Sequence, residues 1–80
     1  MTLLIIGHLK AIVDFTTRQG LTRGTYVAVY VRRAHKALAG RRPEDTEIVY
    51  LEGADLVLEQ PGVRGYIGTL VGLGARERVA

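Results

Sequence analysis

Apolar and polar side chains alternate along residues 10–18, with one exception. The alternation places three apolar side chains on one face of the segment, those of Ala11, Val13 and Phe15. Ile12 falls out of phase, among the polar residues of the opposite face. A period of two residues predicts a half-buried β-strand. Residues 20–24, which begin and end with glycine, break the pattern and predict the tip of a β-hairpin.

A second alternating segment, residues 26–33, is rich in β-branched and aromatic side chains and predicts the clearest strand of the chain. One face would carry the side chains of Val27, Val29 and Val31. The opposite face would carry those of Tyr26, Ala28, Tyr30 and Arg32. The next segment, residues 34–39, fits either a short helix or a continuation of the strand.

The second half of the chain predicts more strands, separated by turn residues. We expect them at residues 46–52, 54–59 and 64–73. Leu56 and Leu58 would supply one buried face, and glycines would let the last strand bend. Residues 40–45 are expected to form a charged loop and residues 60–62 a turn, and residues 74–80 are expected to fray.

Short strands, sharp turns and little helix favour a single all-β domain that spans residues 1–80. We expect a small five-stranded OB-like barrel, an architecture that suits a chain of 80 residues. The alternative is an α+β domain in which residues 34–39 are a helix.

Composition narrows the class of protein. Hydrophobic residues make up 48% of the chain, which favours a packed core over disorder. The absence of Cys excludes disulfides, thiol catalysis and Cys-ligated zinc. The longest purely aliphatic run, residues 3–6, is too short for a signal peptide or a membrane span, so we expect a cytoplasmic protein. Ser, Asn and Trp are also absent and Arg outnumbers Lys nine to two, which indicates a heat-adapted (thermophilic) or GC-rich source.

The net charge of +3 is unevenly divided along the chain. Residues 1–42 carry eight basic groups and one acid, whereas residues 43–80 carry three arginines and seven acids. The first part therefore has a charge of +7 and the second a charge of −4. This asymmetry indicates a surface that binds a polyanion. The alternative is that both signs mix once the chain folds.

Residues that could carry catalysis are scarce. The two histidines, His8 and His35, lack metal-ligand spacing to each other and to a carboxylate, so no metal is expected. Ser and Cys nucleophiles are missing. The glycines of residues 65–74 lack the Lys-Ser/Thr ending of a phosphate loop. We therefore expect no enzyme activity, no cofactor and no small-molecule substrate.

The face that carries Tyr26, Tyr30 and Arg32 is the best candidate for a binding site. Unpaired bases stack on aromatic rings and guanidinium planes whatever the nucleotide sequence. The planar fork of arginine also suits phosphate. The alternative is that the tyrosines pack against a neighbouring strand or a dimer partner.

The segment at residues 15–26, Phe-Thr-Thr-Arg-Gln-Gly-Leu-Thr-Arg-Gly-Thr-Tyr, resembles the DNA-binding hairpin of the filamentous-phage (inovirus) single-stranded-DNA-binding proteins. The resemblance implies an OB-like barrel with a protruding DNA-binding hairpin, a symmetric homodimer and cooperative coating of DNA. It implies phosphate contacts for Arg18 and Arg23, and stacking or cooperative contacts for Tyr26. The tip before Tyr26 is shorter than in that family and lacks a basic residue. Residues 65–70 are similar to a later aromatic-Gly loop, which implies that Tyr66 is a second stacking residue.

Together these observations predict that the chain binds single-stranded DNA without sequence preference. The expected process is phage DNA replication in the host cytoplasm. RNA is left open as an alternative ligand. The expected partners are single-stranded DNA and a second copy of the chain, with no membrane. The expected binding residues are Lys10, Arg18, Arg23, Tyr26, Tyr30, Arg32 and Tyr66. The alternatives are an interaction module or oligomeric structural protein of small-barrel fold, and a binder of double-stranded DNA or RNA.

Overall fold

The protein is built on a four-stranded sheet in which every neighbouring pair of strands is parallel. The computed structural model describes residues 2–80. Across the sheet the order is β2-β1-β3-β4, with bounds β1 (Thr2–Ile6), β2 (Val27–Val29), β3 (Thr46–Tyr50) and β4 (Arg76–Val79). The helices are α1 (Leu9–Gln19), α2 (Ala34–Leu38), α3 (Ala54–Leu58) and α4 (Val63–Gly72), with a 3-10 turn at Pro43–Asp45. The fold is α/β, so the expectation of an all-β, five-stranded OB-like barrel is wrong.

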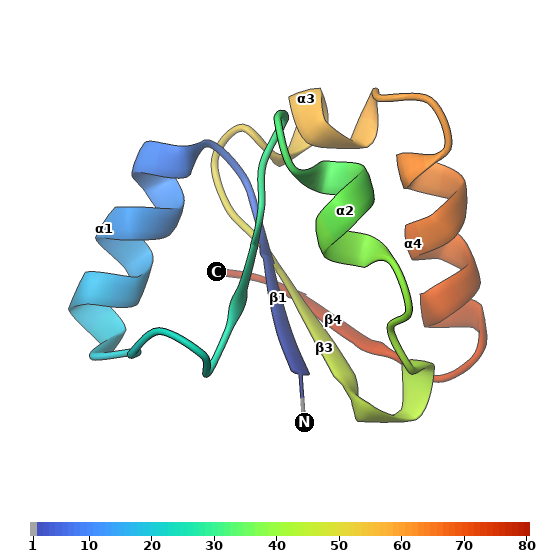
Figure 1. Cartoon of the computed structure of the whole chain (residues 1–80), viewed down its shortest axis with the longest axis horizontal. Coiled ribbons are helices and arrows are strands. Elements are labelled where there is room, and N and C mark those ends of the chain that lie inside the picture. The colour runs from blue at the N-terminus through green and yellow to red at the C-terminus, as the bar shows by residue number, and fades with distance from the viewer. Residues whose placement is uncertain (1) are drawn as a thin grey trace.

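The helices cover the two faces of the sheet unequally, as Figure 1 shows. α1 lies alone on one face, whereas α2, α3 and α4 lie on the other. The chain passes from β1 through α1 to β2 at one edge, and then returns through α2 to β3 on the far side of β1. Right-handed crossovers that run in opposite directions along a sheet place their helices on opposite faces. This rule explains why α1 stands apart from the other helices.

β1 supplies the centre of both halves of the core. Leu4 and Ile6 face α2, α3 and α4, and Ile5 faces α1, and all three side chains are 0% exposed. A central parallel strand is buried on both faces, so its sequence is continuously apolar instead of alternating. The apolar run at residues 3–6 is therefore the signature of a central strand, which a search for alternation does not detect.

Residues 10–18 lie in helix α1, so the expected strand and the hairpin built on it are both wrong. The buried side chains of α1 follow the i, i+3, i+4 spacing of a helix and belong to Ile12, Phe15 and Thr16. Ile12, out of phase in a strand, is 1% exposed, whereas Val13 is 53% exposed. Gly20 ends α1 in the left-handed conformation typical of a helix C-cap, with φ of +68°. Residues 21–26 then form an irregular connection to β2.

The alternation expected for residues 26–30 is confirmed. Val29 is buried among the side chains that face α2, α3 and α4. Tyr26 and Tyr30 pack on the opposite face, beneath α1. β2 is nevertheless an edge strand of only three residues, with a single neighbour in the sheet.

The strand ends earlier than expected, because the chain turns after Tyr30. The N–H of Arg33 donates a hydrogen bond to the carbonyl of Tyr30 (2.9 Å), and α2 follows at once. Val31, which was expected on the buried face, is 48% exposed. The segment at residues 34–39, for which helix and strand were both open, contains helix α2.

The second half contains more helix than strand, contrary to expectation. β3 confirms a strand within residues 46–52, but residues 54–59 contain α3 and residues 64–73 lie in or directly after α4. The tail, expected to fray, forms β4. The turn at residues 60–62 is confirmed.

Helical spacing of apolar residues explains these differences. In α3, Val57 is 1% exposed while its neighbour Leu56, expected in the core, is 53% exposed. In α4 the buried residues are Val63, Ile67 and Leu70, spaced by four and three positions. Five-residue helices such as α3 are too short for the helical spacing to repeat, so their pattern is easily taken for a strand.

The strand order preserves the charge asymmetry of the sequence in space. β1, α1, β2 and α2 come from residues 1–42 and form the β2 side of the molecule, whereas β3, α3, α4 and β4 form the other side. The +7 and −4 parts therefore lie side by side and meet in places, as where Arg18 and Glu52 line one cleft. Among residues 2–80 the one ion pair joins Arg78 to Glu47 (3.6 Å), both from the second part. The basic side chains of the first part thus have no carboxylate at ion-pair distance.

None of the helices within residues 2–80 is both long enough and apolar enough to cross a membrane.

Candidate functional site

Doubly wound sheets usually bind ligands beyond the carboxyl ends of the strands, where the strand order reverses. Here the reversal lies between β1 and β3, and the connections that follow these strands pack against each other. A Cβ placed on Gly7 would lie 2.9 Å from the Cβ of Leu51, and one placed on Gly53 would strike the ring of His8. The N–H of His8 also donates to the carbonyl of Glu52 (2.9 Å). The connections after β1 and β3 are therefore in close contact at the point of reversal.

A cleft of about 600 Å³ lies along the outer edge of β2, and we call it the β2-edge cleft. Four basic side chains and no acidic ones line it. The lining residues are Leu9, Arg23, Gly24, Tyr26, Val27, Ala28, Tyr30, Arg33, Lys36, Ala37 and Arg41. By contrast, the clefts beside α1 and beside β4 each combine an arginine with two carboxylates. The charge of the β2-edge cleft therefore fits an anionic ligand.

Two tyrosines connect this cleft to the core. Tyr26 and Tyr30 are each partly buried and pack against the cluster beneath α1, which contains Ile5, Ile12, Phe15 and Val49. Both also line the cleft. A ring held in this way loses little conformational freedom when a flat ligand packs on it.

The basic residues of the cleft come mainly from α2 and its flanks. Arg33 precedes the helix, Lys36 lies within it, and Arg41 follows it. The Nε of Arg41 donates to the carbonyl of Ala37 (2.8 Å), and its backbone N–H donates to the hydroxyl of Tyr66 (3.3 Å). The first bond holds the guanidinium of Arg41 at the end of α2, and the second ties its backbone to α4.

Of the seven residues predicted from the sequence, Arg23, Tyr26 and Tyr30 meet in the β2-edge cleft. The structure places the other four elsewhere. Lys10 is exposed in the first turn of α1. Arg32 lines a smaller hollow of about 370 Å³ beside His8. The ring of Tyr66 packs against the core from α4.

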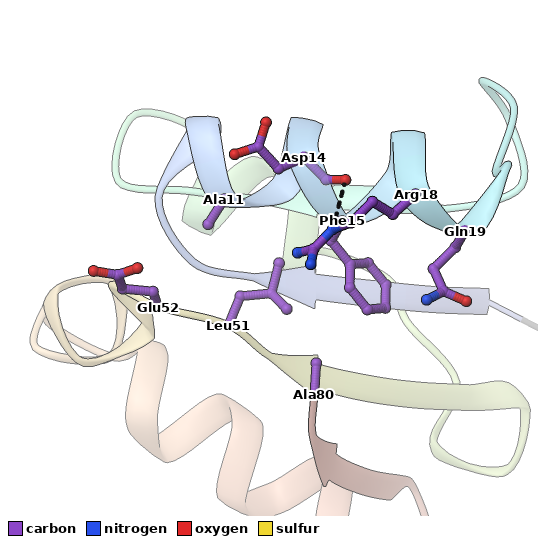
Figure 2. A pocket seen from close by; sticks show the side chains of 8 residues that line it. All are labelled: Ala11, Asp14, Phe15, Arg18, Gln19, Leu51, Glu52 and Ala80. Atoms are coloured by element: carbon purple, nitrogen blue, oxygen red, sulfur yellow. Dashed lines mark hydrogen bonds between the residues drawn. The ribbon is translucent and has the colours of Figure 1, made fainter.

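Arg18 lies in the cleft beside α1, at the ends of β3 and β4, as Figure 2 shows. Its Nε donates to the backbone carbonyl of Asp14 (3.4 Å). Glu52 and the carboxylate of Asp14 line the same cleft, with the ring of Phe15 between helix and sheet. Two carboxylates against one guanidinium do not suit a polyanion, so Arg18 is separated from the basic surface.

Three cleft residues were not predicted from the sequence to bind, although they lie in the basic part of the chain: Arg33, Lys36 and Arg41. To find them, residues 34–38 would have to be recognised as a helix, which the sequence left open. Residues three apart on a helix share a face, which brings Arg33 and Lys36 together. Only the crossover from β2 to β3 then shows that this helix runs beside the edge of the sheet.

Metal ligation is not indicated in the part of the chain that the structure describes. Within residues 2–80 no group of three or more His, Cys, Asp or Glu side chains lies close enough together to hold a metal ion.

A scan against protein-family models found no matching family, and searches of curated proteins and of solved structures found no matching protein.

Proposed function

We propose that the protein is a non-catalytic binder of single-stranded nucleic acid, which it holds in the β2-edge cleft without sequence preference. One observation carries this proposal: a single cleft combines four cations, no carboxylate and two tyrosine rings. Proteins that bind single strands combine a positive groove for the phosphates with aromatic rings for the bases.

The phosphate contacts are assigned to Arg23, Arg33, Lys36 and Arg41. None of these side chains is neutralised by an ion pair among residues 2–80, so their charge is available to a ligand. Arg23 lies before β2 and Arg33 after it, so the cations cover both ends of the strand. A flexible, extended polyanion that runs along β2 can contact all four.

The base contacts are assigned to Tyr26 and Tyr30. They stand four residues apart on one face of the β2 segment, which corresponds to about 13 Å along an extended chain. Bases in a duplex are stacked on one another and cannot reach these rings, whereas unpaired bases can. The rings therefore favour single strands over duplexes.

A second candidate function rests on the unpaired edge of β2. Exposed edge strands bind extended peptides by adding a strand to the sheet. This function would use the backbone of Val27–Val29 and would not require the four cations. An affinity for nucleic acid that depends on the cleft cations separates the two functions.

The test is a titration of labelled oligonucleotides with the wild type and two charge-matched variants. Lys36→Ala removes a cation from the cleft, and Arg76→Ala removes an exposed one from β4 at the opposite edge. We expect Lys36→Ala to weaken single-strand binding about tenfold, the value of one hydrogen bond to a charged group. Arg76→Ala should leave the affinity within about twofold of the wild type, because a distant exposed charge is screened by salt.

The same titration with a duplex of equal length should give weaker binding. Equal weakening by both variants would show that net charge alone attracts the oligonucleotide, and the assignment of the cleft would then fail. No binding of either oligonucleotide at low salt would contradict the proposed function itself.

A further inference from the structure

A second groove lies on the side of the sheet opposite to the β2-edge cleft, where β3 and β4 meet α3 and α4. Two adjoining hollows of about 580 and 220 Å³ share Tyr50, Leu58 and Arg64 in their walls. We call them together the β4-side groove. Much of the lining is apolar, and Val79 in it is 80% exposed. The groove thus offers apolar surface to a partner.

Carboxylates dominate the charge of this groove. Glu52, Asp55 and Glu77 line it against the single cation of Arg64. Glu77 accepts a hydrogen bond from the hydroxyl of Tyr50 (2.8 Å). Burial, and after it this hydrogen bond, raise the pKa of Tyr50, so its hydroxyl stays protonated and keeps Glu77 engaged.

Glu52 and Asp55 differ from Glu77, because neither a side-chain hydrogen bond nor an ion pair engages their carboxylates among residues 2–80. Both side chains are exposed at the carboxyl end of β3. A partner that fits must therefore combine a cation, which pairs with these carboxylates, with an apolar side chain, which packs in the groove.

The loop between β2 and α2 has this chemistry. Val31 is 48% exposed, and the exposed side chains of Arg32 and Arg33 follow it directly. Neither arginine is ion-paired within residues 2–80. The loop follows β2 at one edge of the sheet, while the acidic end of the groove lies between the carboxyl ends of β3 and β4.

Because the strands are parallel, the loop and the acidic end of the groove lie at the same end of the sheet but at opposite edges. Copies placed side by side in one orientation would therefore bring the loop of one copy to the groove of the next. The +7 side of one copy would at the same time face the −4 side of its neighbour.

We propose that the protein associates head to tail, with the loop at residues 31–33 of one copy docked in the β4-side groove of the next. Val31 packs on the apolar lining, and Arg32 pairs with Asp55. Such a contact leaves a free loop at one end and a free groove at the other, so it builds open chains or rings rather than a symmetric dimer. Arg33 also lines the β2-edge cleft, but Arg32 lies outside it, so a change at Arg32 tests this association without removing a cation from the proposed nucleic-acid site.

Charge reversal tests the contact by sedimentation at low salt, without nucleic acid. The wild type should show association that increases with concentration. Arg32→Asp and Asp55→Arg each place like charges at the contact, and each should weaken association at least about tenfold. An equimolar mixture of the two variants should associate again, because each reversed residue then meets an opposite charge on the other variant. Both residues are exposed, and circular dichroism of each variant checks that it is folded.

Arg42→Asp is the matched control, since Arg42 is an exposed cation outside both loop and groove and its reversal should not change association. A wild type that stays monomeric up to high concentration would overturn the proposal. So would a dimer that neither reversal weakens, or a mixture that fails to associate. Oligonucleotide binding by the same variants is measured separately, so either proposal can fail without the other.

Discussion

Tyr30 belongs to the core and to the cleft at the same time, so its substitution by alanine would remove packing and ring surface together. The sequence offered two interpretations of Tyr26 and Tyr30, as stacking residues or as core residues. The structure places each ring partly in both environments. A useful variant must therefore keep the apolar contact and change only the aromatic face.

Tyr30→Leu is such a variant, and Tyr30→Phe is its control. We expect Tyr30→Leu to weaken single-strand binding by about 1–3 kcal/mol, the contribution of one base stacked on an aromatic ring. Its free energy of unfolding should fall by less than about 1.5 kcal/mol, as for other exchanges between large apolar side chains. Tyr30→Phe keeps the ring and should bind nearly as well as the wild type. Equal oligonucleotide affinity for Leu and Phe would rule out stacking at this position.

Gly53 is constrained by both its backbone and its surroundings. Its φ is +88°, and the ring of His8 occupies the place of a Cβ. We expect Gly53→Ala to lower the free energy of unfolding by about 1–3 kcal/mol, measured in urea. In the double variant His8→Ala/Gly53→Ala the clash disappears but the backbone strain remains, so part of the loss should be recovered. A Gly53→Ala variant as stable as the wild type would contradict the closed contact between the β1 and β3 connections.

At the scale of elements, α1 provides the sharpest contrast between strand and helix. In a strand, Val13 would face the core with Phe15, and Ile12 would face solvent. In α1 the positions are reversed, with Ile12 buried and Val13 half exposed. The two assignments therefore make opposite predictions for neighbouring residues.

We expect Ile12→Ala to lower the free energy of unfolding by about 2–5 kcal/mol, the usual cost of removing a large aliphatic side chain from a core. Val13→Ala should change it by less than about 0.5 kcal/mol, since Ala also favours helix. Urea denaturation of both variants gives the comparison. A larger loss for Val13→Ala would restore the strand assignment.

Gly68 tests whether residues 63–72 are helical. It lies within α4, and a Cβ at this position would meet nothing within 4 Å. Alanine is favoured over glycine in a helix by about 0.5–1 kcal/mol, so Gly68→Ala should raise the melting temperature by about 2–8 °C. An unchanged or lower melting temperature would indicate that this segment is not an ordinary helix.

Alternation of apolar and polar positions predicted residues 26–30 correctly, and a strand was also expected at the place of β3. It failed for β1, which is buried on both faces, left α2 open between helix and strand, and gave a strand in place of α3. A helix of five residues spans little more than one turn, so its apolar spacing does not repeat. It also failed for α1, where the out-of-phase Ile12 was the one sign of a helix. The parallel sheet was therefore not predicted, because the crossover helices α1, α3 and α4 were expected to be strands.

At the scale of the whole molecule, strand order determines which charges face a ligand. The four cations of the β2-edge cleft come from the first part of the chain, and the acids of the second part lie across the sheet. If all four neutralise phosphates, the logarithm of the binding constant should fall with the logarithm of salt concentration with a slope of about −3. A slope near zero would exclude phosphate contacts as the source of affinity.

About half of the site was accessible from the sequence. The charge division and the pair Tyr26 and Tyr30 are local features of the sequence, and the structure keeps both. Arg33, Lys36 and Arg41 join them only because the crossover from β2 to β3 carries α2 past the sheet edge. Arg18, chosen through the resemblance, lies in another cleft, because residues 15–19 end a helix instead of forming a hairpin limb.

The most direct test of the β2-edge cleft is a map of backbone amide shifts in the labelled protein during titration with a short single-stranded oligonucleotide. We predict that the largest shifts fall on residues 23–30 and 33–41, which surround the cleft. The amide shifts of β4, at the far edge of the sheet, should not change at concentrations that keep the protein monomeric. Shifts centred on β4 or α4, or no shifts at saturating oligonucleotide and low salt, would contradict the account.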